Sequence, residues 1–331
     1  MNVVTIYTID ALRPARRTPR LQNLIFMMNW MQIFGAEKIP WSQIEHMKDS
    51  APEIIIWAIP VLFISVLIEI FITFKQNKKY YSKKESIGSL AVGVGNILIS
   101  TWIKVGLFYV SVWIYNMVPW RMEMNWWTMI PCYLLFDFCS YWAHNISHRQ
   151  RFWWATHIAH HSAEHYNLTV AFRLSWVQYL KIIFLFPVPL LGFHPIIFFV
   201  TNQIAILFQF WVHTEYIGKL PRFFEYIFAT PSNHRVHHGS QEKYINKNFG
   251  ATFIFWDRIF GTYQKETEQA IYGITNNIEH KSNPFHINFH EYSDIIKDVK
   301  NATGWKEKLF FVFGNPSKIA RYKKLNQFNE S

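Results

Sequence analysis

The chain has 331 residues, half of them hydrophobic, with 30 Phe, 15 Trp and 16 Tyr. So much aromatic surface argues against an ordinary water-soluble fold, while a mean hydropathy of +0.01 argues against a chain made only of membrane spans. The net charge of +11 suits nucleic acid, anionic lipid headgroups or an acidic protein. Since no nucleic-acid-reading motif is present and the basic residues flank apolar segments, we expect a lipid surface and no nucleic-acid partner.

The first 50 residues are predicted to form a basic arm at the membrane interface. Four arginines lie between residues 13 and 20, and Asn and Gln interrupt the apolar residues 21–34 that follow. No clear small-residue cleavage site comes next, so the pattern does not predict a cleavable signal peptide.

Three apolar segments have about the length that crosses a bilayer, and a fourth is broken. The unbroken segments are residues 54–74, 87–118 and 126–143. Residues 179–211 contain Pro187, Pro189, Gly192 and Pro195, so we expect two half-spans that turn back on each other. Two cysteines, Cys132 and Cys139, lie two helical turns apart in the third segment, too far to form a disulfide.

The orientation follows from the loop between the first two spans, which carries five lysines between Lys75 and Lys84. The positive-inside rule places this loop in the cytoplasm. Counting spans onward places residues 144–172, and everything from residue 213 to the C-terminus, on the same side. The sequence therefore predicts an all-α integral membrane protein, in a bacterial cytoplasmic membrane or the endoplasmic reticulum, with an active site that faces the cytoplasm.

The predicted fold has about four transmembrane helices or helical hairpins and a cytoplasmic helical cap. We divide the chain into an interfacial arm (1–50), transmembrane helices (51–126), a catalytic domain (127–275) and a basic cytoplasmic tail (276–331).

Eight of the 15 histidines fall into three short boxes, HNISH, HIAHH and HRVHH. Spacings of three and four place the members of each box on one helical face, where they can present imidazoles to one metal site. All three boxes lie on the predicted cytoplasmic side, near the ends of spans. The box residues are His144, His148, His157, His160, His161, His234, His237 and His238.

The number of imidazoles indicates two metal ions. A catalytic zinc takes three protein ligands and usually a carboxylate base, as in His-Glu-x-x-His, and that motif is absent. Eight imidazoles suit two ions with about four nitrogens each, although imidazole binds iron, copper and zinc and does not by itself select the metal.

The boxes, together with NKNFGATFIFWDRIFGTY and the YGI that begins at Tyr272, resemble the fatty acid hydroxylase/sterol desaturase superfamily of membrane di-iron enzymes. The stretches SAEHYNLTVAFRLSW and NPFHINFHEY are most similar to the alkylglycerol monooxygenase branch and its bacterial relatives. The resemblance covers residues 85–316. It implies two iron ions, molecular oxygen, a lipid substrate in the membrane and an external electron donor, either tetrahydrobiopterin or a cytochrome- or ferredoxin-type protein.

Further residues could complete the centre. In the superfamily a histidine between the second and third boxes can join the metal set, and His213 has that place here. Asp137 lies two turns before His144 in an apolar run, where a bond to a ligating imidazole and a bond between helices are equal alternatives. By resemblance, Glu164 and Asn167 are further candidates beside the ligands.

The resemblance implies hydroxylation of an unactivated C–H bond. Hydroxylation next to an ether oxygen would give a hemiacetal that collapses to an aldehyde, whereas loss of a second hydrogen would give a sterol or acyl desaturase. Two other classes stay open: a histidine-rich metal transporter, which the one-sided boxes disfavour, and a zinc hydrolase.

Overall fold

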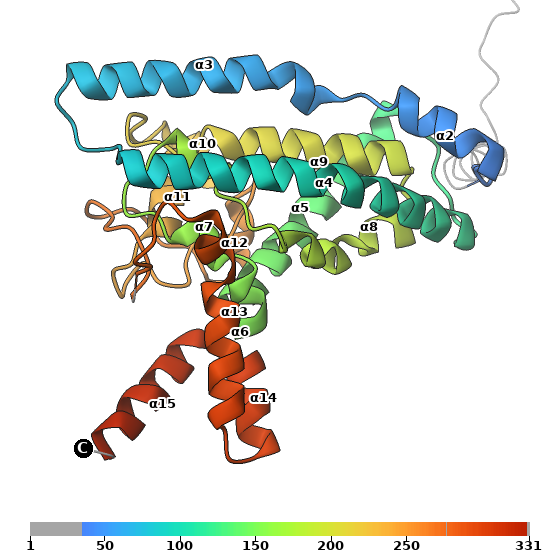
Figure 1. The fold of residues 1–331 in the computed structure, drawn as a ribbon. Coiled ribbons are helices and arrows are strands. Elements are labelled where there is room, and N and C mark those ends of the chain that lie inside the picture. Colours follow the sequence, from blue (N-terminus) through green and yellow to red (C-terminus); the bar gives the residue numbers. More distant parts are fainter. Residues whose placement is uncertain (1–34, 276, 330–331) are drawn as a thin grey trace, which may run out of the picture.

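The computed structural model describes residues 35–275 and 277–329 (Figure 1). This part of the chain is helical and its only β-pairings are two isolated bridges, Gly35 with Arg121 and Phe228 with Phe253. The all-α prediction is confirmed. The predicted interfacial arm lies mostly outside the described residues, apart from its last helix, α2 (Trp41–Ser50).

Within residues 35–275 and 277–329, two helices are long and apolar enough to cross a membrane. They are α3 (Ile54–Lys75), which follows α2, and α4 (Lys83–Met117). The bounds of both helices match the first two predicted spans within a few residues. Both leave most of their apolar surface uncovered, with Trp57 83% and Trp102 82% exposed. Helices that expose such side chains along their length suit lipid and not water. The protein is a membrane protein; the count of four spans stays a prediction.

The third predicted span is the first part of α5 (Trp126–Arg149), which continues past residue 143 and carries the first histidine box. Its start is fixed by a capping box, in which the Asn125 side chain accepts a hydrogen bond from the Thr128 N–H (2.9 Å). Both cysteines are buried on this helix and unpaired, as predicted.

The broken apolar segment folds back as predicted. It forms η2 (Gln178–Leu185), α8 (Pro187–Leu190) and, after a turn, α9 (Pro195–Phe210). Gly192 occupies the turn with a φ of +84°, and a Cβ there would lie 2.0 Å from the Trp120 carbonyl oxygen. The hairpin packs against α5 through Cys132, Phe136 and Phe198.

Short helices form around the histidine boxes, on the side of the molecule where α4 begins (Figure 1). They are α6 (Arg151–Ala155), α7 (Ile158–His161), η1 (Leu168–Phe172), α10 (Arg222–Ile227), α11 (Pro231–His238) and α12 (Phe255–Ile259). Three further helices, α13 (Pro284–Asn301), α14 (Trp305–Phe313) and α15 (Pro316–Asn329), project away from the long helices (Figure 1).

Candidate metal centre

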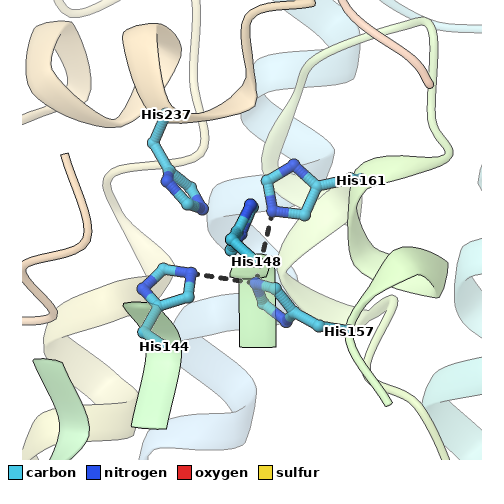
Figure 2. Close-up of side chains that lie close together, drawn as sticks. All are labelled: His144, His148, His157, His161 and His237. Carbon is cyan, nitrogen blue, oxygen red and sulfur yellow. Dashed lines mark hydrogen bonds between the residues drawn. The ribbon is translucent and has the colours of Figure 1, made fainter. Parts of the chain in front are cut away.

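The three boxes and His213 converge on two adjacent clusters. The first contains five histidines whose ligand nitrogens all lie within 4.8 Å of one another: His144, His148, His157, His161 and His237. Figure 2 shows these rings meeting from α5, the second box and α11. The Nε2 of His157 lies 2.9 Å from that of His144 and 3.2 Å from that of His161.

The second cluster contains four buried histidines within the same limit: His160, His213, His234 and His238. Their Nε2 atoms form a closed ring of contacts between 3.0 and 3.2 Å. The two clusters touch, because the ring of His161 stacks on that of His238 with centroids 4.3 Å apart. All nine predicted histidines are thus brought together.

The expectation that each box faces one site is wrong for the second and third boxes. Successive residues of a helix point about 100° apart. His160 therefore turns to the second cluster while His161 turns to the first. On α11 the i, i+4 pair His234 and His238 faces the second cluster, and His237 between them faces the first. Only the first box, an i, i+4 pair on α5, presents both imidazoles to one cluster.

Hydrogen bonds to backbone carbonyls fix how several rings present their nitrogens. The Nδ1 of His144 lies 2.8 Å from the carbonyl oxygen of Phe249. The Nδ1 of His213 lies 2.8 Å from the carbonyl oxygen of Gln209, and the Nδ1 of His237 lies 3.0 Å from that of Lys247. A carbonyl only accepts, so Nδ1 carries the proton and Nε2 keeps its lone pair. Such outer bonds are usual behind metal-ligating histidines.

The buried nitrogens fit a metal ion better than they fit each other. Nε2 of His148, Nε2 of His237 and Nδ1 of His160 are buried without a hydrogen-bond partner, and such atoms are rare unless something else binds them. Two imidazoles on one ion, with metal–nitrogen bonds of about 2.1 Å, hold their nitrogens roughly 2.9–3.4 Å apart. The observed separations of 2.9–3.2 Å fall in that interval.

Burial keeps these imidazoles neutral. It lowers the pKa of His213 and of His237 to about 4. The same burial, with neighbouring cationic imidazoles as the next cause, lowers the pKa of His160, His161 and His238 well below 6.5. At neutral pH the clusters therefore offer uncharged nitrogen donors, which is the form that binds a metal.

The three polar candidates beside the ligands do not bond to the imidazoles. Asp137 is fully buried, but its carboxylate accepts from the N–H groups of Thr252 (2.8 Å) and Phe253 (3.2 Å) and from the Trp256 indole (3.0 Å). Asp137 thus joins α5 to residues 252–256, which lead into α12, and it does not bond to an imidazole.

Glu164 and Asn167 also have other roles. Glu164 lies at the surface and accepts hydrogen bonds from Asn277 and Lys281. The Asn167 side chain caps η1 by accepting from the Thr169 N–H (3.0 Å), and it donates to the Tyr80 oxygen (2.7 Å). Both residues hold the loop after the second box and neither touches a ligand.

Two positioning residues lie behind the clusters. Asp257 accepts from the N–H groups of Phe249 and Gly250 (2.7 Å each), and Phe249 in turn holds His144. Arg173 donates to the Ala159 oxygen (2.9 Å), and it thereby supports the second box through a hydrogen bond.

Arg235 and Tyr166 cover the second cluster. The Arg235 guanidinium binds both carboxylate oxygens of Glu266 (2.7 and 2.9 Å) and the carbonyl oxygens of Thr214 and Ile217. It therefore ties α11 to the segment that follows His213. The Tyr166 ring packs against His238 at 5.1 Å between centroids.

Comparison with known proteins agrees with this centre. Residues 129–262, the region that contains all three boxes, match the family model described as Fatty acid hydroxylase. The resemblance predicted from the boxes is confirmed.

The chain is similar over most of its length to alkylglycerol monooxygenases. It is 34% identical to the one from Xenopus tropicalis over 275 residues and 33% identical to the one from Homo sapiens over 276 residues, in each case 81% of this chain and 60% of the relative. The chain thus spans about 60% of these relatives' length. An ornithine lipid hydroxylase, OlsE of Rhizobium tropici, is 26% identical over 135 residues, or 38% of this chain and 39% of the relative. No solved structure matches the chain.

Proposed function

We propose that the protein is a membrane-bound di-iron monooxygenase that hydroxylates an unactivated C–H bond of a lipid, with an alkyl ether lipid as the preferred substrate class. The observation that carries the proposal is the pair of touching imidazole clusters, with five and four nitrogen donors. The lipid class is supported by the names of the relatives, which act on alkylglycerols and on an ornithine lipid.

In this proposal the five-histidine cluster holds one iron ion and the four-histidine cluster the other. Iron suits imidazole, and a neutral nitrogen shell leaves each ion its positive charge for binding oxygen. When bound, the metal pair supplies the reactivity toward dioxygen, and the overall change is RH + O₂ + 2e⁻ + 2H⁺ → ROH + H₂O. The electrons come from an external donor, either tetrahydrobiopterin or a small redox protein.

The chain's own residues orient the ligands and keep water away. The carbonyls of Phe249, Gln209 and Lys247 hold three rings by Nδ1, so Nε2 faces inward in each. Seven of the nine histidines are at most 9% exposed. A dry site protects a reactive centre from side reactions and lets an acyl or alkyl chain lie beside it.

The proposed site faces the cytoplasm. The loop after the second box bonds to the first turn of α4, where Glu85 accepts from the N–H groups of Glu164 (3.1 Å) and His165 (3.0 Å). The lysine-rich loop precedes that turn directly, so the clusters lie at the basic end of the span.

The test combines purified protein with defined lipids, oxygen and an electron donor, either tetrahydrobiopterin or a reduced small redox protein. We expect a 1-O-alkylglycerol to be converted to glycerol and a fatty aldehyde, with oxygen consumed, and an ester analogue of the same chain length to be left intact. Replacing His157, His161, His234 or His238 by Ala should abolish turnover and lower the bound iron.

His286→Ala is the matched control, because His286 lies on α13 outside both clusters. Full turnover by an iron-free preparation would end the proposal. Oxygen consumption with fatty acyl or sterol substrates alone would keep the iron centre and reject the ether-lipid assignment.

A further inference from the structure

The helices α13, α14 and α15, here called the C-terminal arm, leave the body near the lysine-rich start of α4. At 1.5 Å per residue α4 is about 52 Å long, well beyond the hydrocarbon core of about 30 Å. The loop before α13 meets α4 at Gly88, where a Cβ would lie 2.2 Å from the Lys281 oxygen. Gly88 is five residues, or about 8 Å, from the lysine-rich start of α4. If α4 spans the bilayer, this contact therefore lies near headgroup depth. In Figure 1 α13 and α14 lead away from the long helices, across the direction of α4, and α15 slants away beside them, so the arm extends sideways from the span.

The arm is tied to α6, the short helix between the first and second boxes. Arg151, three residues after the first box and 4% exposed, donates to Glu291 (2.6 Å) and to Asp298 (2.5 Å) on α13. Its backbone N–H also donates to the Gly314 oxygen at the end of α14 (3.0 Å). These bonds consume two of the arm's carboxylates and fix the angle at which it projects.

One side of α14 presents an uncovered apolar stripe. Trp305, Leu309 and Phe313 follow each other at intervals of four residues, and they are 68%, 48% and 50% exposed. An exposed apolar stripe on an arm at headgroup depth has the geometry of a helix that lies in the membrane interface.

The arm also carries unpaired cations. Among the described residues, six exposed basic side chains of the arm form no ion pair: Lys300, Lys306, Lys308, Lys318, Arg321 and Lys324. The arm's carboxylates, by contrast, are engaged. Asp294 pairs with Lys297 (3.3 Å), and Glu307 accepts from the Tyr322 hydroxyl (2.8 Å) and the Thr303 N–H (2.9 Å). The free charge of the arm is therefore positive.

We propose that the C-terminal arm docks on the anionic surface of the membrane that holds α3 and α4, with the α14 stripe in the interface and the six cations on lipid phosphates. The apolar stripe supplies burial and the cations supply attraction to acidic headgroups. A second copy of the chain is a poorer occupant, because two arms of equal positive charge repel each other. Through Arg151 the docked arm would set the orientation of the first box relative to the lipid surface.

The test uses the full chain in lipid nanodiscs made of phosphatidylcholine alone or with about one third phosphatidylglycerol. Leu309→Cys is labelled with an environment-sensitive dye; the native Cys132 and Cys139 are buried and do not compete. We expect the dye to be quenched by bromine-labelled lipid in the anionic discs and much less in the neutral ones. Lys306→Glu with Lys308→Glu should lower the equilibrium constant for docking, as derived from the quenching, by at least about tenfold.

Arg222→Glu with Lys265→Glu is the matched control, since it makes the same change in charge on exposed residues outside the arm that form no ion pair with a described residue. It should leave the quenching unchanged. A dye that stays in water in both lipids overturns the proposal. The proposal is also overturned if the quenching is equally strong in neutral and anionic discs and is unchanged in the variant with Lys306→Glu and Lys308→Glu. A dye that is shielded without lipid quenching indicates a protein partner or a second copy and overturns it equally.

Discussion

The ion pair inside the third box is a sensitive probe of how the second cluster is held. Arg235 is 6% exposed and binds Glu266 through two parallel hydrogen bonds. Arg235→Met keeps the length of the side chain but leaves the Glu266 carboxylate, whose side chain is 11% exposed, without its cation. Breaking a buried pair in this way costs about 3–5 kcal/mol of unfolding free energy.

Removing both charges should be milder. In Arg235→Met with Glu266→Met neither member of the pair is left without its partner, and the remaining loss comes from the Thr214 and Ile217 carbonyls that Arg235 also binds and from its attraction to Glu215. Two such hydrogen bonds are worth about 1–3 kcal/mol together. We therefore expect the double variant to be at least about 1 kcal/mol more stable than Arg235→Met alone.

The assay is unfolding of the purified variants in detergent, with bound iron measured in parallel. Both variants should retain iron less well than the parent, because α11 loses its tie to the segment after His213. A double variant no more stable than Arg235→Met, or a single variant that loses less than about 1 kcal/mol, would refute the reasoning.

Three further predictions follow from the packing and the titration of the site. Gly88→Ala should destabilise the protein by about 1–3 kcal/mol, because its Cβ has no room against the loop before α13, whereas Gly106→Ala on the same helix meets nothing within 4 Å and should be neutral or slightly stabilising in thermal unfolding. Asp257→Ala should weaken iron binding about 10–100-fold in a chelator competition, since it frees the backbone that orients a ligand; unchanged binding would deny it this positioning role. In metal-free protein the folded-state pKa of His213 and of His237 lies near 4, below the unfolded value of about 6.5. The folded state therefore binds fewer protons than the unfolded state between these two pH values. The free energy of unfolding should be highest above pH 6.5 and should fall as the pH drops toward 4. A thermal unfolding midpoint that rises as the pH is lowered would contradict this sign.

The histidines could be found from sequence because their signal is local. Spacings of three and four, repeated in three boxes, selected His144 through His238, and His213 was added by its place between boxes. The first two spans were found for the same reason, since a continuous apolar run is visible without any tertiary contact. The turn of the hairpin followed from Gly192 and its neighbouring prolines.

The partners of the polar residues could not be found in this way. Asp137 was correctly singled out as a buried charge that needs donors, but its donors come from Thr252 and Phe253, 115 and 116 residues later in the chain. The division of the second box between two clusters depends on how the single turn of α7 is docked, which spacing alone does not set. Arg235 stands inside a histidine box, and only the folded chain brings Glu266 to it.

The most direct measurement is the iron content per chain of the purified protein and of one variant in each cluster. We expect two irons in the parent protein, and a loss of iron in His144→Ala, from the five-histidine cluster, and in His213→Ala, from the four-histidine cluster. His194→Ala, at the turn of the hairpin, should keep both. A parent protein that binds no iron when it is active, or cluster variants that keep their full iron content, would contradict the account.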